Sequence, residues 1–283
     1  MERVIPACSV ATKKSLTEFE LLKFSLEQYH KVEWFVATDD YTAKALSHYK
    51  NVNVINKIKT DDCSHGVNDP VKNRLFLELI MTKFDAMEAA IEKHGVGFFV
   101  DSDMFFVNPL EKRFLDLLWN EDVDAILSPH MTNNLGLETQ VGHFNVGFFA
   151  VRNKSYLEQH RDMSWKSKEL GMYYEQQPLQ FTSYEYLTVN APIYYNIGWW
   201  RFNEQHSVSR LQWLREVDGR VMLKNNPAVC FHAHTMKSLD YNNSGLFLVQ
   251  RVFDIMVKCI NEHDNKDYRA FLEKYNELNN GKS

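Results

Sequence analysis

Two patterns of apolar and polar residues alternate along the chain, and they predict strands and helices in succession. Short apolar runs are typical of strands buried on both faces, and the segments after them carry apolar residues at helical spacing. This alternation predicts an α/β fold, with a mostly parallel sheet joined by right-handed crossovers and flanked by helices. The predicted strands cover 4–12, 34–38, 52–55, 96–100, 123–127, 144–152 and 228–231.

Helix signals lie between the predicted strands. The first helix begins at the capping box Ser15-Leu-Thr-Glu18, and the longest helix ends at His94-Gly95, a typical C-terminal signal. Segments 59–70 and 132–142 are rich in residues that favour turns and are expected to be loops. The predicted helices cover 16–29, 41–49, 71–93, 110–119, 154–171, a segment that ends near 187, 246–260 and 268–278.

Asp101 and Asp103 stand directly after the apolar strand 96–100. Carboxylates do not belong in a core, so this strand must deliver them to the C-terminal edge of the sheet, where open α/β folds bind ligands. Because one residue separates them, their side chains share one side of an extended segment and form a hard oxygen site for a divalent cation. The same spacing in Asp122-Val-Asp124 follows a predicted helix end and indicates a solvated turn.

Composition and charge narrow the classes of function. A composition with 45% hydrophobic and 24% charged residues is that of a globular protein. The net charge of −5 and the pI of about 6.1 leave no basic stripe for a nucleic-acid partner. No apolar run is long enough to span a membrane, and the N-terminus does not resemble a signal peptide, so we expect a cytoplasmic protein without a transmembrane segment.

The four cysteines are scattered without CxxC spacing, which is typical of reduced thiols. Cys63 and His65 lie on the loop 59–70, and we disfavour a metal site there because no second cluster of ligands is nearby in sequence. Trp199 and Trp200 lie in an aromatic run with polar residues between its rings. Such rings either stack on sugars in an acceptor groove or pack in the core.

Further polar residues could complete a site around the two aspartates. His232 and His234 follow the last predicted strand, and either could ligate a metal. A mixed set of carboxylate and imidazole ligands favours Mn²⁺ or Mg²⁺ over Ca²⁺. Arg74 and Lys83 lie on the predicted helix 71–93, where each either reaches a phosphate or belongs to the solvated face of the helix.

Four motifs resemble, in their order along the chain, those of the nucleotide-sugar glycosyltransferases with the GT-A fold, and most of all glycosyltransferase family 8 and its relatives. The resemblance runs from Val4 to about Lys237. The motifs are Asp101-Ser-Asp103 with its strand, Phe144-Asn-Val-Gly, Glu175-Gln-Gln-Pro-Leu, and His232 with Lys237 downstream.

The resemblance implies one Rossmann-like GT-A domain over 1–283. It would have a nucleotide-sugar-binding half (1–130), an acceptor half (131–240) and a C-terminal helical extension (245–283). It also implies metal-dependent transfer of a sugar from a nucleoside-diphosphate sugar, usually a UDP-sugar, to a glycan or another hydroxyl acceptor. The sequence carries no signal for the oligomeric state.

The same resemblance implies a role for each candidate residue. The metal, Mn²⁺ or Mg²⁺, would be held by Asp101, Asp103 and His232. The donor would be contacted by Ala11, Thr12 and Asp39 at the nucleoside, by Lys83 or Arg74 at phosphate or sugar, and by Ser102 and Lys237. The residues that would face the transferred sugar are Asn145, Glu175 and Gln176.

Two departures from the family pattern bear on the mechanism. Glu175 stands where the pattern has Asp, and in the His-x-x-Gly-x-x-Lys ending Thr235 replaces the Gly and Lys237 comes one residue early. If Glu175 lies beside the acceptor hydroxyl, it could act as a general base and give inversion. If Gln176 lies under the anomeric carbon, retention is favoured. The sequence leaves both open.

Two other functions fit the same pattern. A nucleotidyltransferase that forms sugar nucleotides would use a Gly-rich, basic loop after the first strand, and this chain has Ala7-Cys-Ser-Val-Ala-Thr-Lys-Lys14 there. The other is a catalytically silent protein that binds sugars or assembles with a partner. Such a protein would not need Asp101, Asp103 and His232, so their presence argues against it.

Overall fold

The structure is a computed structural model that describes residues 3–59, 69–131, 135–198, 213–233, 246–262 and 273. The chain forms two compact units, and each is considered by itself. The first unit comprises Met1–Leu16, His30–Ser102 and Leu110–Ile193, and the second comprises Thr17–Tyr29, Asp103–Pro109 and Tyr194–Ser283. The predicted division into donor, acceptor and C-terminal parts stays a prediction.

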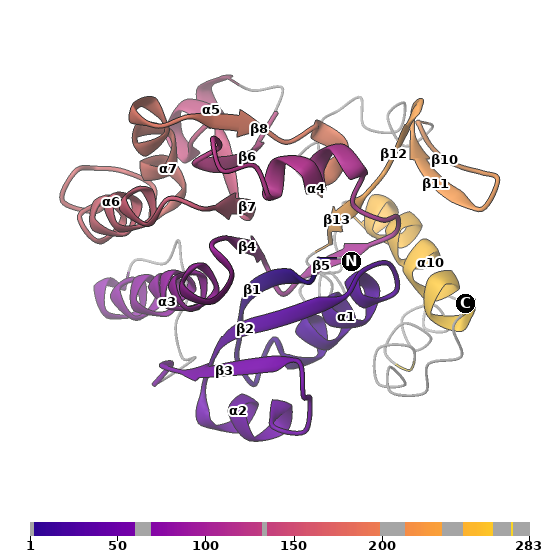
Figure 1. The fold of residues 1–283 in the computed structure, drawn as a ribbon, viewed down its shortest axis with the longest axis horizontal. Helices are drawn as coiled ribbons and strands as arrows, with labels where there is room; N and C mark the ends of the chain where they lie inside the picture. The colour runs from indigo at the N-terminus through magenta and orange to yellow at the C-terminus, as the bar shows by residue number, and fades with distance from the viewer. Residues whose placement is uncertain are drawn as a thin grey trace. The chain divides into compact units, whose positions relative to one another are not determined.

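A seven-stranded mixed sheet forms the centre of the first unit, with the strand order β3-β2-β1-β4-β7-β6-β8 (Figure 1). Its strands are β1 (Ile5–Ala11), β2 (Val32–Thr38), β3 (Val52–Asn56), β4 (Gly97–Val100), β6 (Ala125–Pro129), β7 (Phe144–Val151) and β8 (Thr188–Asn190). Neighbouring strands are parallel, except that β7 runs antiparallel to both β4 and β6. The predicted α/β architecture with a mostly parallel sheet is confirmed.

Helices cover both faces of this sheet, because successive residues of the central strands direct apolar side chains to each face. Phe98 of β4 and Phe148 of β7 contact Phe114 of α4 (Lys112–Leu118). Phe99 and Phe149 point to the other face and belong to the core beneath α3, α6 and α7. These three helices span Pro70–His94, Lys154–Trp165 and Gln176–Thr182, and α2 spans Asp40–Leu46.

The longest helix, α3, has the end signals that its sequence predicts. The side chain of Asp69 accepts hydrogen bonds from the backbone N–H groups of Val71 and Lys72, and Pro70 occupies the first turn. Gly95 ends the helix with a left-handed backbone, at φ 75°. The helix therefore begins and ends within two residues of its predicted limits.

Three features of the first unit differ from the sequence-based prediction. Part of the expected loop 132–142 forms helix α5 (Leu135–Val141), which packs against α7. The expected helical segment up to Leu187 is divided into α7 and the 3₁₀ helix η1 (Ser183–Glu185), and β8 follows it where no strand was expected. Helix α6 ends at Trp165, earlier than predicted, and residues 166–171 continue as turns up to Gly171, at φ 67°.

The second unit contains α1 (Leu16–Glu27) from its second residue onward, α10 (Leu246–Glu262), the last two residues of the 3₁₀ helix η2 (Ile193–Tyr195), and two small sheets. One sheet has the order β5-β13-β9, from Met104–Phe106, Cys230–His232 and Ile197–Gly198. The other is formed by β10 (Leu214–Val217), β11 (Arg220–Leu223) and β12 (Asn226–Pro227). Phe24, Phe105, Phe231, Val252 and Met256 belong to the apolar core that joins these elements.

Some predictions concern other parts of the chain. Cys63, His65, Trp199, Trp200 and the predicted helix 268–278, apart from residue 273, lie outside the described residues. The described cysteines, Cys8, Cys230 and Cys259, are all free thiols. Within the described ranges, no helix is both long enough and apolar enough to cross a membrane. The cytoplasmic location stays a prediction.

Candidate functional site

The two aspartates lie where β4 ends and the chain continues into β5. The backbone N–H of Asp101 donates to the carbonyl of Gly147 (2.9 Å), which holds this residue beside β7. Asp103 directly precedes β5, whose antiparallel partner is β13, and the register places His232 opposite Met104. The backbone N–H of Ala233 donates to the carbonyl of Asp103 (3.0 Å). Strand pairing therefore brings a histidine from late in the sequence to the second aspartate.

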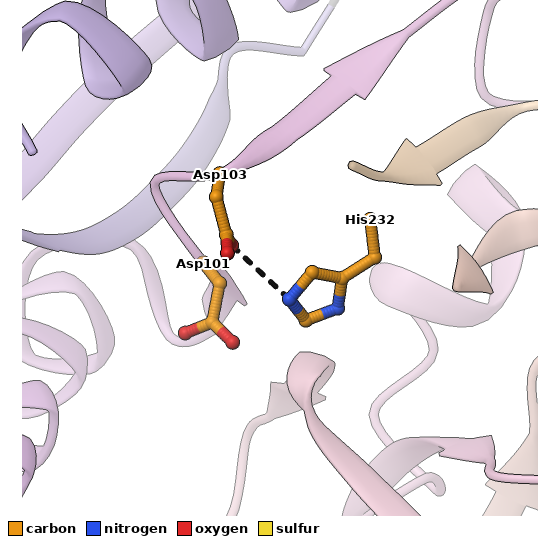
Figure 2. A group of neighbouring side chains, drawn as sticks. All are labelled: Asp101, Asp103 and His232. Carbon is orange, nitrogen blue, oxygen red and sulfur yellow. Dashed lines mark ion pairs between the residues drawn. The ribbon is translucent and has the colours of Figure 1, made fainter. Parts of the chain in front are cut away.

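The side chains of Asp101, Asp103 and His232 form a cluster of possible metal ligands (Figure 2). The Nε2 atom of His232 lies 3.1 Å from Oδ1 of Asp103, and one ligand atom from each of the three residues lies within 4.8 Å of the others. His232 is buried and both aspartates are half-buried. Two carboxylates and one imidazole at this spacing fit a divalent cation such as Mn²⁺ or Mg²⁺. Ser102 lies in the turn between the aspartates.

A buried ion pair joins α3 to the start of α7. The Nζ atom of Lys83 lies 2.8 Å from Oε1 of Glu175, and only 3% and 9% of the two side chains are exposed. The ammonium also lies 4.7 Å from the ring centre of Phe99, a cation–π distance. His160 contacts the backbone carbonyl of Glu175 through Nε2 (2.8 Å). Burial lowers the pKa of His160 to about 4; the hydrogen bond to Glu175 opposes this shift, and the charge of Lys83 adds to it. Histidine is therefore neutral here at ordinary pH.

A chain of hydrogen bonds fixes the amides of Asn145 and Gln176. The carbonyl of Gly142 can only accept, so Nδ1 of His130 carries the proton (2.8 Å), and Nε2 accepts from the amide of Asn145 (3.3 Å). That amide also donates to Oε1 of Gln176 (3.4 Å), while its oxygen accepts from the backbone N–H of Gly147 (3.0 Å). The amide nitrogen of Gln176 donates to the carbonyl of Val141 (2.9 Å). The carbonyls of Gly142 and Val141 can only accept and the backbone N–H of Gly147 can only donate, so these bonds fix the orientation of both amides.

Uncommon backbone conformations gather around the same residues. Met131 follows His130 with φ 51°, and Tyr174 precedes Glu175 with φ 41°, both in the left-handed region that costs about 1–3 kcal/mol for such residues. Gly142 has φ 103°, and a Cβ atom there would lie 2.9 Å from the backbone oxygen of Gln176. This position therefore requires glycine for its backbone angle and for its closeness to α7.

The residues expected at the nucleoside lie at the C-terminal ends of β1 and β2. Ala11 and Thr12 are buried. Asp39 caps α2 by accepting from the backbone N–H of Thr42 (2.7 Å), and it also accepts from the backbone N–H of Lys13 (2.8 Å). Burial raises the pKa of Asp39, but these hydrogen bonds outweigh it and hold the pKa below its usual range. Asp39 is thus a structural cap, and a role at the nucleoside stays a prediction.

Of the two remaining donor-binding candidates, Arg74 and Lys237, only Arg74 is among the described residues, and it is not brought to this site. Arg74 is exposed and pairs with Glu78 one turn along α3, as expected for the solvated face of a helix. Lys237 and the alternative ligand His234 lie outside the described residues.

Sequence reasoning missed His130, Gly142 and the anchoring histidine His160. His130 had a usable signal, because it is a polar residue directly after an apolar strand, at the edge where α/β folds bind ligands. Gly142 lay in a segment with several turn-forming residues, so the sequence did not show that this glycine lies against the start of α7. His160 is fully buried on a helix, and its sequence gives no such signal.

Comparison with solved structures shows the same fold in glycosyltransferases. The galactosyltransferase LgtC, crystallised with donor and acceptor sugar analogues, is similar over 90% of this chain and 96% of its own, with 13% identity and a TM-score of 0.58. The glycosyltransferase GlyE of Streptococcus pneumoniae is similar over 97% of this chain and 64% of its own, with 11% identity and a TM-score of 0.59. Mouse xyloside xylosyltransferase 1 is similar over 81% of this chain and 97% of its own (13% identity, TM-score 0.50).

No protein-family model matches the sequence, and no curated protein is matched by sequence. At these identities the structural similarity establishes the fold. The chain has the GT-A fold of glycosyltransferases, as the order of its motifs predicts. Its place in glycosyltransferase family 8 stays a prediction.

Proposed function

We propose that this protein is a metal-dependent glycosyltransferase that moves a sugar from a nucleoside-diphosphate sugar, most simply a UDP-sugar, to a hydroxyl group of a glycan or another acceptor. The observation that carries the proposal is the cluster of Asp101, Asp103 and His232 after β4 in a GT-A fold. The similar glycosyltransferases LgtC, GlyE and xyloside xylosyltransferase support sugar transfer as the reaction class.

The ligand set explains why a metal is needed. Two bare carboxylates would repel a diphosphate, because like charges in contact at a partly desolvated site cost several kcal/mol. A divalent cation bound by Asp101, Asp103 and His232 would remove this repulsion and act as a Lewis acid on the leaving diphosphate. His232 is held for this role by strand β13, and Asp103 by the backbone pairing that joins the two residues.

In the proposed reaction, the bond between the anomeric carbon and the diphosphate oxygen breaks, and a bond to the acceptor oxygen forms. The acceptor hydroxyl loses its proton, and the products are a glycoside, a nucleoside diphosphate and a proton. Asn145 and Gln176 present amide groups with fixed orientation, which can hold sugar hydroxyls without reorganisation. Lys83 supplies a buried positive charge in the same unit.

The ion pair with Lys83 bears on the stereochemistry of the transfer. Oε1 of Glu175 accepts from Lys83, and the side chain is almost fully buried. A carboxylate held in this way is a poor candidate to take the proton of an incoming hydroxyl. We therefore favour Glu175 as a positioning residue for Gln176, and transfer with retention of the anomeric configuration over inversion.

Thermal unfolding with UDP, GDP, CMP and dTDP, each with Mn²⁺ and again with EDTA, tests the proposal. A nucleotide at one hundred times its Kd adds about 2.7 kcal/mol to stability, which raises the Tm by a few degrees. We expect a rise with a uridine nucleotide that requires Mn²⁺ and is lost in Asp103→Ala.

The chain offers a matched control for this test. Asp122 belongs to the second Asp-x-Asp sequence and is exposed, so Asp122→Ala should keep the full response. If no nucleotide gives a Mn²⁺-dependent rise in Tm, or if Asp103→Ala keeps the full rise, the cluster does not hold a metal–nucleotide complex.

A further inference from the structure

A pocket of about 300 Å³ lies at the same edge of the sheet as Asn145. Pro129 ends β6, Phe144 begins the antiparallel β7, and Asn190 ends β8, so all three mark one edge. The pocket continues that edge from β7 outward to β8. It is lined by Pro129, Met131, Glu138, His143, Phe144, Gln180, Ser183, Tyr184 and Asn190.

The lining has the chemistry of a carbohydrate site. Tyr184 is 77% exposed, and it offers an apolar face beside a hydroxyl group. The carboxylate of Glu138, the imidazole of His143 and the amides of Gln180 and Asn190 are polar partners around it. A sugar ring combines one face of C–H groups with an edge of hydroxyls, which matches an aromatic surface ringed by donors and acceptors. The volume is at the lower end of the range for small-ligand sites, about 300–1,000 Å³.

Several of these side chains are fixed by their own contacts. Oε1 of Gln180 accepts from the backbone N–H of His143 (3.2 Å), and the hydroxyl of Ser183 donates to the carbonyl of Gln180 (2.6 Å). Nδ1 of His143 lies 3.6 Å from Oε2 of Glu138. The ring of Phe181 contacts that of Tyr184 edge to face, with centres 6.4 Å apart. The walls from α5, α7 and η1 are therefore linked, as a preorganised binding site requires.

We propose that this pocket binds a sugar ring of an oligosaccharide acceptor, next to the sugar that receives the transferred group. The inference rests on the proposed glycosyltransferase function, and it names a class of acceptor that the function alone does not. Gln180 lines the pocket one turn of α7 after Gln176, and residues four apart lie on the same face of a helix, so the pocket adjoins a residue expected to face the transferred sugar. The carboxylate, imidazole, amide and hydroxyl groups of the lining offer donors and acceptors for the hydroxyl groups of a sugar.

The test compares Tyr184→Ala, Tyr184→Phe and the control Trp165→Ala, which removes an exposed ring of α6 outside the pocket. The probes are a panel of p-nitrophenyl monosaccharides and the corresponding di- and trisaccharides. Their binding is followed by saturation-transfer NMR, and their glycosylation by steady-state kinetics. Hydrolysis of the sugar nucleotide in the absence of acceptor is measured in parallel, because it reports the donor site alone.

We expect Tyr184→Ala to raise KM for the longer glycosides about three- to tenfold, the effect of losing one aromatic contact, with kcat and donor hydrolysis unchanged. Tyr184→Phe should keep most of the affinity, because the ring remains, and Trp165→Ala should behave as the parent. NMR should show saturation transfer to the longer glycosides that Tyr184→Ala removes.

The experiment distinguishes an error in the proposed acceptor pocket from an error in the proposed glycosyltransferase function. If Tyr184→Ala and the parent have equal KM values for the longer glycosides and donor hydrolysis is intact, the proposed acceptor site is wrong, and the proposed glycosyltransferase function still stands. If hydrolysis and nucleotide binding are absent in the parent, the general function fails, and the NMR arm still tests sugar binding. Glycoside binding that is unchanged in Tyr184→Ala would also overturn the proposal. So would the absence of glycoside binding together with a self-association or protein contact that Tyr184→Ala abolishes.

Discussion

Replacement of Lys83 by methionine tests whether the ion pair with Glu175 is part of the folded structure. The variant would leave a carboxylate buried without its partner, because only 9% of the Glu175 side chain is exposed. Breaking one side of a buried pair costs about 3–5 kcal/mol, whereas replacing both sides by apolar groups is often neutral. We therefore expect Lys83→Met to lower the Tm by roughly 10 °C, and the double variant Lys83→Met/Glu175→Leu to recover most of that loss.

The measurement is thermal unfolding followed by circular dichroism at neutral pH, with Lys112→Met as the matched control. Lys112 pairs with Asp116 on the surface, with 87% and 62% of the side chains exposed. An exposed pair contributes about 0–1 kcal/mol, so this control should melt within about 2 °C of the parent. If Lys83→Met melts as the control does, the buried pair does not stabilise the fold, and Lys83 is better understood as a free ligand for phosphate.

Three other predictions follow from the same region. Gly142→Ala should lose most activity and on the order of 2 kcal/mol or more of stability, because it forces a strained φ and a contact with α7; urea unfolding and initial rates check this. The pKa of His160, depressed from 6.5 to about 4, contributes stability above pH 6.5 that is lost as the pH falls toward 4. Between pH 7 and pH 5 the parent should thus lose on the order of 2 kcal/mol more than His160→Gln, and equal losses in urea titrations would contradict the assignment. Proton NMR of the first product should show the anomeric configuration of the donor, and an inverted product would return Glu175 to the role of general base.

The sequence predicts the fold and the acidic half of the metal cluster because both depend on local patterns. A strand buried on both faces has a continuous apolar run, and Asp101 and Asp103 interrupt the apolar pattern at its end. The proximity of His232 to Asp103 depends on the pairing of β5 with β13, two short strands far apart in sequence. Residue spacing contains no information on such a pairing, and only the resemblance to a family suggested it.

Burial of charge was the least predictable feature of the candidate site. Lys83 and Arg74 lie on the same helix, and the sequence offers the same alternatives for both. In the structure Lys83 is buried against Glu175, whereas Arg74 is exposed and pairs with Glu78. A lysine is almost never buried without a partner, and this partner lies 92 residues away. The outcome is therefore decided by tertiary packing and not by the helix itself.

The contacts of Glu175 and Gln176 suggest why a glutamate is suitable at a position where the family pattern that the sequence resembles has aspartate. Glu175 reaches Lys83 on α3, and the next residue, Gln176, begins α7 and contacts Asn145 on β7. The two side chains thus anchor the start of one helix to two different elements. An aspartate at this position would be one methylene shorter, so we expect it to hold the 2.8 Å contact with Lys83 less well. We therefore expect the longer carboxylate to help fix the position of Gln176, whichever residue accepts the proton.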